Sequence, residues 1–389
     1  MNSMELESRY TSGVYGKRPF TMVRGEGATL WDENGRSYID CGAGISVANV
    51  GHSHPVVTAA ITSQASTLLN CPEMFYNDQR AQFLSRLAAI LPGDLDRIFL
   101  CNSGTEAIEG AIKFARLSTG RSEVISTVRG FHGRTMGALS ATHNKKYRQP
   151  FMPLISGFSH VPFNKIEAME TAVTDQTAAV IVEIVQGEGG VRPGSRSYFQ
   201  ALRKLCADRG ALLILDEVQT GYGRTGSMFA CEQMGIVPDI ICLGKAIAAG
   251  VPMGAIGLGG RVTDLPKGSH GSTFGGNPLA CAVANAVLDI YEAEGLVERS
   301  AQLGARLLEK LQAIQSPIIR DVRGMGLMIG IELRQRVMPF VLALMAEGIV
   351  VLNAGPNVLR LLPPLVISEA ELDVVVERIT AVLQPEVVG

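Results

Sequence analysis

The sequence is short of the features that mark secreted, membrane-spanning and nucleic-acid-binding proteins. Its seven cysteines are scattered, odd in number and without a CxxC pair, which fits reduced cytosolic thiols better than a disulfide framework. The formal net charge is only −2, which gives no support to a nucleic-acid or anionic-membrane partner. The opening stretch MNSMELESRYTSG lacks the apolar core of an export signal. We therefore expect a cytoplasmic protein.

The chain also lacks a long uninterrupted apolar run and an internal repeat. Its nearest approach to a membrane span, residues 236 to 260, is interrupted by Pro238, Asp239, Lys245 and Pro252. At 389 residues the chain exceeds one ordinary core, so a large domain with a smaller one is expected. Hydrophobic residues make up 47% of the sequence, enough for a sizeable core, and the 43 glycines predict many tight turns.

One glycine motif raises the question of a dinucleotide site. The stretch LILDEVQTGYGRTG, residues 213 to 226, contains the GxGxxG spacing. A dinucleotide turn needs its glycines directly after a strand, but here Asp216 and Glu217 come first. The acid at the expected distance for ribose binding, Asp239, precedes an apolar run instead of ending one. We therefore interpret the glycines as a turn and ask what Asp216 does.

Short apolar runs predict buried strands at residues 178 to 185, 211 to 215 and 239 to 243. Between the first two, residues 197 to 209 have the spacing of an amphipathic helix, which Gly210 ends. This β-α-β pattern predicts parallel strands covered on both faces. Ligands of such sheets bind at the carboxyl ends of the strands, where Asp216 falls.

Beyond about residue 280 the pattern changes. Residues 279 to 314 contain two helix-like stretches, and IRDVRGMGLMIGIEL, residues 319 to 333, reads as two strands joined at glycines. We expect a smaller α+β domain here. The expected division is an N-terminal segment, residues 1 to 55, that packs with the small domain, a large domain, residues 56 to 280, and the small domain, residues 281 to 389.

Three further patterns carry chemistry. In LCNSGTEAIEGAIKFAR, Ser103, Gly104 and Thr105 precede a helical segment, which suits a phosphate cradle and equally a simple helix cap. Lys245 in ICLGKAIAAG follows an apolar run, and burial there would lower its pKa toward a nucleophilic amine able to form a Schiff base. The alternative is a lysine whose stem extends to solvent.

The third pattern, RGFHGRTMGALSAT, sets Phe131, His132 and Arg134 between glycines, where an aromatic plane and a guanidinium would meet a flat, acidic ligand. The four patterns together, in the order SGTEA, FHGR, DEVQ and GK, resemble the class III aminotransferases. Flanking stretches QGEGGV, STFGGNPLA and RLLPPL agree, and the resemblance covers essentially the whole chain. It implies pyridoxal 5′-phosphate, a type I fold with a mostly parallel seven-stranded sheet, and a smaller α+β domain.

The resemblance also implies roles for individual residues. Lys245 would carry the cofactor and shuttle a proton, and Asp216 would pair with the pyridine nitrogen. The other residues expected at the cofactor are the cradle residues, the ring-stacking residues and their neighbours: Ser103, Gly104, Thr105, Phe131, Glu217, Val218 and Gln219. Thr273 would reach the phosphate of the neighbouring subunit, so a homodimer with shared active sites is expected.

For the substrates, the resemblance implies a donor with a terminal amine. Arg134 and Ser272 would hold its distal carboxylate. Glu188 would neutralise Arg360 while the donor is bound, then release it to 2-oxoglutarate or glutamate through a bidentate contact. The expected reaction is a ping-pong exchange between N-blocked ornithine or lysine and 2-oxoglutarate.

Several alternatives remain open at this point. Acetylornithine and substrates linked to an amino-group carrier protein share the same reacting end. An acidic carrier would need a basic rim, for which Lys145, Lys146 and Arg148 are candidates. Ornithine and 4-aminobutyrate aminotransferases and a catalytically silent cofactor-binding regulator are the other hypotheses. His52 and His54 in GHSHP have the spacing of metal ligands but no nearby acid or cysteine in a ligand pattern, so no metal site is expected.

Overall fold

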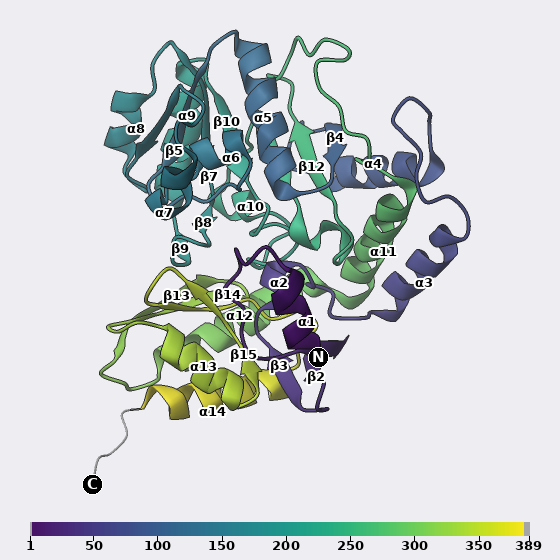
Figure 1. Ribbon diagram of the computed structural model, residues 1–389. Coiled ribbons are helices and arrows are strands. Elements are labelled where there is room, and N and C mark those ends of the chain that lie inside the picture. Colours follow the sequence, from purple (N-terminus) through teal and green to yellow (C-terminus); the bar gives the residue numbers. More distant parts are fainter. Residues whose placement is uncertain (1, 385–389) are drawn as a thin grey trace.

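The computed structural model describes residues 2–384, and residues 385–389 of the expected small domain lie outside the described part. A seven-stranded sheet with helices on both faces forms the upper body in Figure 1. Its strands, in spatial order, are β4 (Arg97–Cys101), β12 (Gly254–Leu258), β11 (Ile240–Leu243), β10 (Leu212–Asp216), β7 (Thr177–Val182), β5 (Glu123–Thr127) and β6 (Phe158–Val161). All neighbours pair in parallel except those of β12, which is antiparallel to both β11 and β4.

Successive side chains of the central strands point to opposite faces of the sheet and are apolar on both, which explains why both faces are covered. On β10, Leu212 and Ile214 pack with α5 (Gly104–Thr119) and α6 (Met136–Ala141), while Leu213 and Leu215 face the opposite core. That opposite core includes residues of α9 (Arg196–Asp208), α10 (Ala230–Met234) and α4 (Asp78–Ile90). The predicted β-α-β unit is confirmed, although β7 ends at Val182 and residues 185 and 186 form a separate short strand.

A second body contains the C-terminal elements, and the N-terminal strands join it (Figure 1). Its four-stranded sheet has the order β13-β14-β17-β16, and all its pairs are antiparallel. Its strands and helices are β13 (Ile319–Met325), β14 (Met328–Leu333), β17 (Val358–Leu361), β16 (Leu352–Ala354), α12 (Leu296–Gln312), α13 (Met338–Ala346) and α14 (Glu369–Leu383). The expected smaller α+β unit is thus present.

The beginning of the chain lies beside this second body. Strand β3 (Ser37–Asp40) pairs in parallel with β15 (Ile349–Val350), more than 300 residues further along the chain. The same sheet contains β1 (Met22–Glu26) and β2 (Thr29–Asp32). The other elements are α1 (Ser3–Tyr10), α2 (Ala43–Ser46), α3 (Pro55–Ala65), α7 (Lys145–Arg148), α8 (Ile166–Ala172), α11 (Pro278–Glu294), β8 (Val185–Gln186), β9 (Arg192–Pro193) and the 3₁₀ turns η1 (Gln149–Phe151) and η2 (Lys245–Ala248).

The GYGRTG stretch joins the two bodies. It forms turns after β10, and Gly226, at φ +88°, lies so close to α12 that an added Cβ would be 3.0 Å from Ala301. Arg224 is fully buried and donates to the Leu327 carbonyl at 2.9 Å and the Pro363 carbonyl at 2.6 Å. These contacts fix the small-body strands against the end of β10. The glycines therefore serve packing between the bodies.

No helix between residues 2 and 384 combines the length and apolar composition that crossing a membrane requires. The two histidines of the GHSHP stretch each have an acidic partner. His52 lies 2.7 Å from Asp40, and His54 lies 2.9 Å from Glu294. These contacts connect the N-terminal segment internally and to α11.

Candidate active site

A cavity of about 190 Å³ lies at the carboxyl edge of the large sheet. It collects side chains from segments that are far apart in the sequence. Its lining residues are Gly104, Thr105, Phe131, His132, Glu183, Glu188, Asp216, Val218, Gln219 and Lys245. The structure therefore brings together most of the side chains that the sequence singles out.

Asp216 is the last residue of β10 and is almost fully buried. Its Oδ2 atom lies 2.8 Å from His132 Nδ1, and its Oδ1 atom accepts a hydrogen bond from the Val218 N–H at 3.1 Å. Burial opposes the charged imidazolium, but the hydrogen bond and charge of Asp216 outweigh it and raise the pKa of His132. The pair can hold a proton on a ligand ring nitrogen.

The start of α5 also lines the cavity. Ser103 caps this helix by accepting the Glu106 N–H at 3.3 Å, so the helix-cap interpretation holds for its side chain. Gly104 and Thr105 line the cavity at the positive end of a 16-residue helix, which suits a phosphate group. Gly104 is sterically required here, because an added Cβ would be 2.5 Å from Val218 Cγ1.

Lys245 lies at the start of η2, directly after β11, and has a left-handed backbone with φ 48°. Such a conformation is uncommon for a residue with a side chain, and residues that adopt it cluster at functional sites. Burial lowers the pKa of Lys245, although the nearby Glu188 and Asp216 carboxylates oppose the shift. A lowered pKa favours the neutral form of the amine, which is the form that nucleophilic attack requires.

Glu183 ties two loops of the site together. Its Oε1 atom accepts the Phe131 N–H at 3.0 Å, and its Oε2 atom accepts the Gly187 N–H at 3.1 Å. Burial raises the pKa of Glu183 to about 7, while His132 opposes the shift. The clamp fixes the backbone of the aromatic residue Phe131 and of the loop that carries Glu188.

Arg360, from β17 of the small body, reaches into this site. The residue is 2% exposed, and its Nη1 atom lies 2.6 Å from Glu188 Oε1 and 3.3 Å from Gln219 Oε1. The arginine is therefore neutralised by a carboxylate at the edge of the cavity. A substrate carboxylate could replace Glu188 in this contact.

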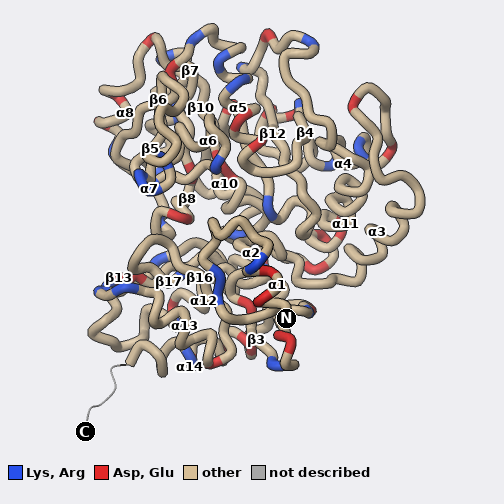
Figure 2. The backbone as a smooth tube through the Cα atoms, in the orientation of Figure 1, with Lys and Arg blue, Asp and Glu red and all other residues tan. Residues whose placement is uncertain are grey.

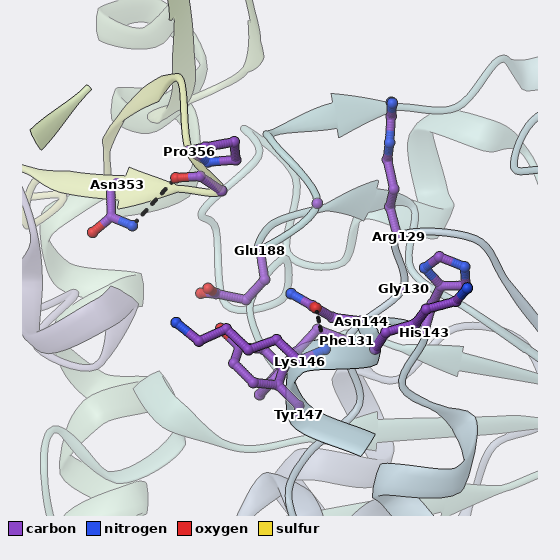
Figure 3. A pocket seen from close by; sticks show the side chains of 13 residues that line it. Arg129, Gly130, Phe131, His143, Asn144, Lys146, Tyr147, Glu188, Asn353 and Pro356 are labelled. Atoms are coloured by element: carbon purple, nitrogen blue, oxygen red, sulfur yellow. Dashed lines mark hydrogen bonds between the residues drawn. The ribbon is translucent and has the colours of Figure 1, made fainter. Parts of the chain in front are cut away.

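A larger cavity of about 500 Å³ adjoins the first and shares Phe131 and Glu188 with it. Figure 3 shows Phe131, Tyr147 and Lys146 on one side of it and Asn353 and Pro356 of the small body on the other. Near this cavity the Arg134 guanidinium carbon is 3.6 Å from the centre of the Tyr147 ring. The sequence-predicted guanidinium thus lies beside the outer cavity and over an aromatic ring.

Besides Ser103, Arg134 and Arg360, three more predicted site residues do not line the inner cavity in the described part of the chain: Glu217, Ser272 and Thr273. The buried Glu217 carboxylate accepts the N–H groups of Ala230 at 3.1 Å and Cys231 at 2.8 Å, so it serves the N-terminus of α10 instead of a ligand. Ser272 accepts hydrogen bonds from Asn102 and from the Gly275 N–H, both at 3.0 Å. Thr273 is exposed on the surface of its own chain.

The residues present fit pyridoxal 5′-phosphate. The Asp216–His132 pair suits the ring nitrogen, Phe131 and Val218 offer apolar faces to the ring, and the N-terminus of α5 suits the phosphate. Lys245 supplies the amine that would hold the cofactor. Together with the mostly parallel sheet, this site defines an enzyme dependent on pyridoxal phosphate and with the type I fold.

Comparison with known proteins gives the family. The model of the class-III aminotransferases matches residues 11–383, and the chain belongs to this family. It is 52% identical over 384 residues to the LysW-aminoadipate semialdehyde transaminase of Deinococcus radiodurans, covering 98% of this chain and 90% of that one. It is 45% identical over 375 residues to the acetylornithine aminotransferase of Methanosarcina acetivorans, covering 96% and 94%. The chain is an aminotransferase.

Solved structures agree. The ornithine aminotransferase of Toxoplasma gondii ME49 superposes with a TM-score of 0.94 at 35% identity, covering 98% of this chain and 94% of that chain. The acetylornithine aminotransferase of Elizabethkingia anophelis superposes with a TM-score of 0.87 at 33% identity, covering 98% and 97%. The fold and the cofactor expected from the sequence are thereby confirmed.

Two residues of the site carry more than the sequence indicated. The sequence patterns gave His132, in the FHGR stretch, no role, and they did not single out Glu183, which lies within the apolar run of residues 178 to 185. A signal for Glu183 was available, because it follows β7 as Asp216 ends β10, and parallel neighbours end at the same edge. No local pattern pairs His132 with a residue 84 positions away.

Proposed function

We propose that the chain transfers the terminal amine of an N-blocked ornithine or lysine to 2-oxoglutarate, giving a semialdehyde and glutamate. The observation that carries this proposal is the pairing of Arg360 with Glu188 at 2.6 Å beside Lys245. A terminal amine bears no carboxylate next to the reacting carbon, so a permanently free Arg360 would be an uncompensated buried charge during that half-reaction. The Glu188 carboxylate removes this penalty by pairing with Arg360. In the other half-reaction, the α-carboxylate of the substrate glutamate takes the place of Glu188 in that contact.

Bound pyridoxal phosphate supplies an electron sink for the bond that is broken. The protein groups around it have separate tasks. The Nζ atom of Lys245 accepts the proton from the substrate carbon and returns it, which its lowered pKa favours. Asp216, supported by His132, holds the proton on the ring nitrogen. Phe131 and Val218 confine the ring between apolar faces and exclude water from it.

Selection of the terminal amine requires a grip on the far end of the donor. We propose that Arg134 provides this grip, with Ser272 assisting. Arg134 is solvent-exposed beside the outer cavity, in a position to meet a carboxylate that enters through it. A donor held there by its distal carboxylate would extend its terminal amine toward Lys245 in the inner cavity.

The outer cavity also supports a carrier-linked substrate. Its volume of about 500 Å³ leaves room beyond a small blocking group, and its wall includes Lys145 and Lys146 of α7. Figure 2 shows basic positions at α7. With Arg148 these residues form a basic rim that would attract an acidic carrier protein. The Deinococcus relative, whose name includes the carrier LysW, favours this branch.

The active site is proposed to belong to a homodimer. Thr273 and the adjacent Phe274 are exposed, as are Met74, Phe75 and Tyr76. Exposed apolar side chains of this size are typical of surfaces that another subunit covers. In such a dimer, Thr273 would reach the phosphate of the neighbouring subunit. We also propose a cytoplasmic location and the three-part division at residues 55 and 280.

The test of the substrate compares kcat/KM for acetylornithine and for a carrier-linked donor at two salt concentrations. We expect activity on acetylornithine, with the carrier-linked donor preferred at low salt and the preference smaller at high salt, because salt screens an exposed basic rim. A preference for acetylornithine at both concentrations would eliminate the carrier and leave arginine biosynthesis. Free ornithine as the best donor would instead support the function named for the Toxoplasma structure.

A further inference from the structure

Within the described residues, the Arg134 side chain contacts aromatic rings and is paired with no acid. Its guanidinium carbon lies 3.6 Å from the centre of the Tyr147 ring and 5.6 Å from that of Phe131. Among residues 2–384 no hydrogen bond or ion pair involves this side chain. The flat face of the guanidinium is therefore engaged while its N–H edges remain available.

This arrangement differs from that of Arg360 in a way that matters for binding. The N–H edge of Arg360 is occupied by Glu188, so an incoming carboxylate must first displace an acid. A carboxylate that approaches Arg134 meets free N–H groups and has nothing to displace. Face stacking and bidentate edge binding use different parts of one guanidinium and can occur together.

Tyr147 also links this guanidinium to the ring of Phe131, which lines the inner cavity. The Tyr147 and Phe131 rings meet edge to face, with centroids 6.0 Å apart and an interplanar angle of 81°. Tyr147 lies on α7, whose N-terminus Asn144 caps by accepting the Lys146 N–H at 3.0 Å. The Phe131 backbone is in turn held by Glu183. One ring thus fixes the position of Arg134 relative to the cofactor site.

We propose that Tyr147 is a specificity-determining positioning residue, which orders the Arg134 guanidinium for the distal carboxylate of the amino donor. This inference rests on the proposed function, since it takes Arg134 as the donor's carboxylate grip. Without the ring, a long exposed arginine would sample many rotamers, and binding would bear the cost of ordering it. Tyr147 should therefore affect donors that carry a distal carboxylate and leave amines without one unaffected.

The experiment uses the cofactor-loaded enzyme and the pair Tyr147→Leu and Tyr147→Phe. N-Acetylnorvaline, which is acetylornithine without the reacting amine, is titrated calorimetrically, so the readout is binding and not turnover. A cation–π contact at a partly exposed site corresponds to roughly a 3- to 30-fold change in affinity. We expect Tyr147→Leu to weaken N-acetylnorvaline by that factor and Tyr147→Phe to stay within about twofold, because phenylalanine keeps the ring face.

Two controls separate positioning from general damage. Tyr147→Leu should leave the reaction of a simple alkylamine, which lacks the carboxylate, within about twofold of wild type. In an Arg134→Ala background it should add no further loss, since the group it orders is gone. Equal losses with acetylornithine and the alkylamine would overturn the inference and show that Tyr147 only supports the fold.

The inference and the proposed function can fail separately. If Arg134→Ala weakens N-acetylnorvaline but Tyr147→Leu does not, the Tyr147 inference is wrong and the donor site stands. If Arg134→Ala leaves N-acetylnorvaline binding unchanged, the donor site is wrongly located and the inference falls with it. If neither acetylornithine nor glutamate reacts with the wild-type enzyme, the proposed function itself is wrong.

Discussion

Replacing Arg360 with alanine should separate the two half-reactions of this aminotransferase. In the structure the Arg360 guanidinium is buried, 2.6 Å from Glu188, and lies beside the cavity of Lys245. In the proposed reaction, glutamate uses that guanidinium for the carboxylate next to its reacting carbon, whereas a donor that reacts at a terminal amine does not. Loss of one partner of a buried charged contact costs about 2–5 kcal/mol, which corresponds to roughly a 30- to 5000-fold loss in kcat/KM.

In the assay, the cofactor-loaded enzyme is mixed with glutamate or with acetylornithine under single-turnover conditions, and the absorbance of the cofactor is recorded over time. Arg360→Ala should show the large loss with glutamate and a much smaller one with acetylornithine. The matched variant Glu188→Gln keeps the size of the side chain but removes its charge, so it should favour glutamate relative to acetylornithine. Equal losses with both substrates in both variants would show that the Arg360–Glu188 pair is no switch.

Two further predictions concern the cofactor site. Gly104→Ala would place a Cβ 2.5 Å from Val218 Cγ1, so the variant should lose pyridoxal phosphate during dialysis. Wild type and the control Gly16→Ala, which has open space around the added Cβ, should keep the cofactor under the same conditions. Equal retention in both variants would refute the steric argument. Because Asp216 raises the folded-state pKa of His132, the stability this pair contributes is fully present below about pH 6.5 and is lost as pH rises through the raised pKa. The melting-temperature difference between wild type and His132→Leu should therefore shrink as pH increases, and a difference that grows with pH would contradict the assignment.

Local sequence patterns predict much of the fold, because the spacing of apolar residues reflects which positions of each strand and helix are buried. The β7, α9 and β10 elements follow from apolar runs and a helical period that tertiary contacts reinforce. The pairing of β3 with β15 does not follow in this way, because it joins residues over 300 positions apart and its strands are short. The buried contacts of Arg224 with the small body cannot be predicted either, because the partner residues are more than 100 positions away in the sequence. The local pattern around Arg224 is a glycine motif that suggests a nucleotide-binding turn.

The site shows the same division. Strand-end position was sufficient to single out Asp216, and an apolar setting was sufficient for Lys245. Glu217 follows Asp216 directly in the chain, and the sequence therefore predicts it at the cofactor as well. In the structure its carboxylate instead accepts N–H groups at the N-terminus of α10. Contacts between side chains of distant loops, such as Arg134 on Tyr147, require the folded backbone.

The measurement that tests the central claim most directly is a panel of half-reactions with the purified, cofactor-loaded protein. Candidate amines are mixed one at a time with the enzyme, and the cofactor spectrum is followed. We predict a yellow protein whose spectrum changes with glutamate and with acetylornithine, and a Lys245→Ala variant that loses turnover, since general acid–base help alone is worth roughly 10²–10⁴-fold. A wild-type protein that responds to glutamate but to no terminal amine of an N-blocked diamino acid would contradict the account.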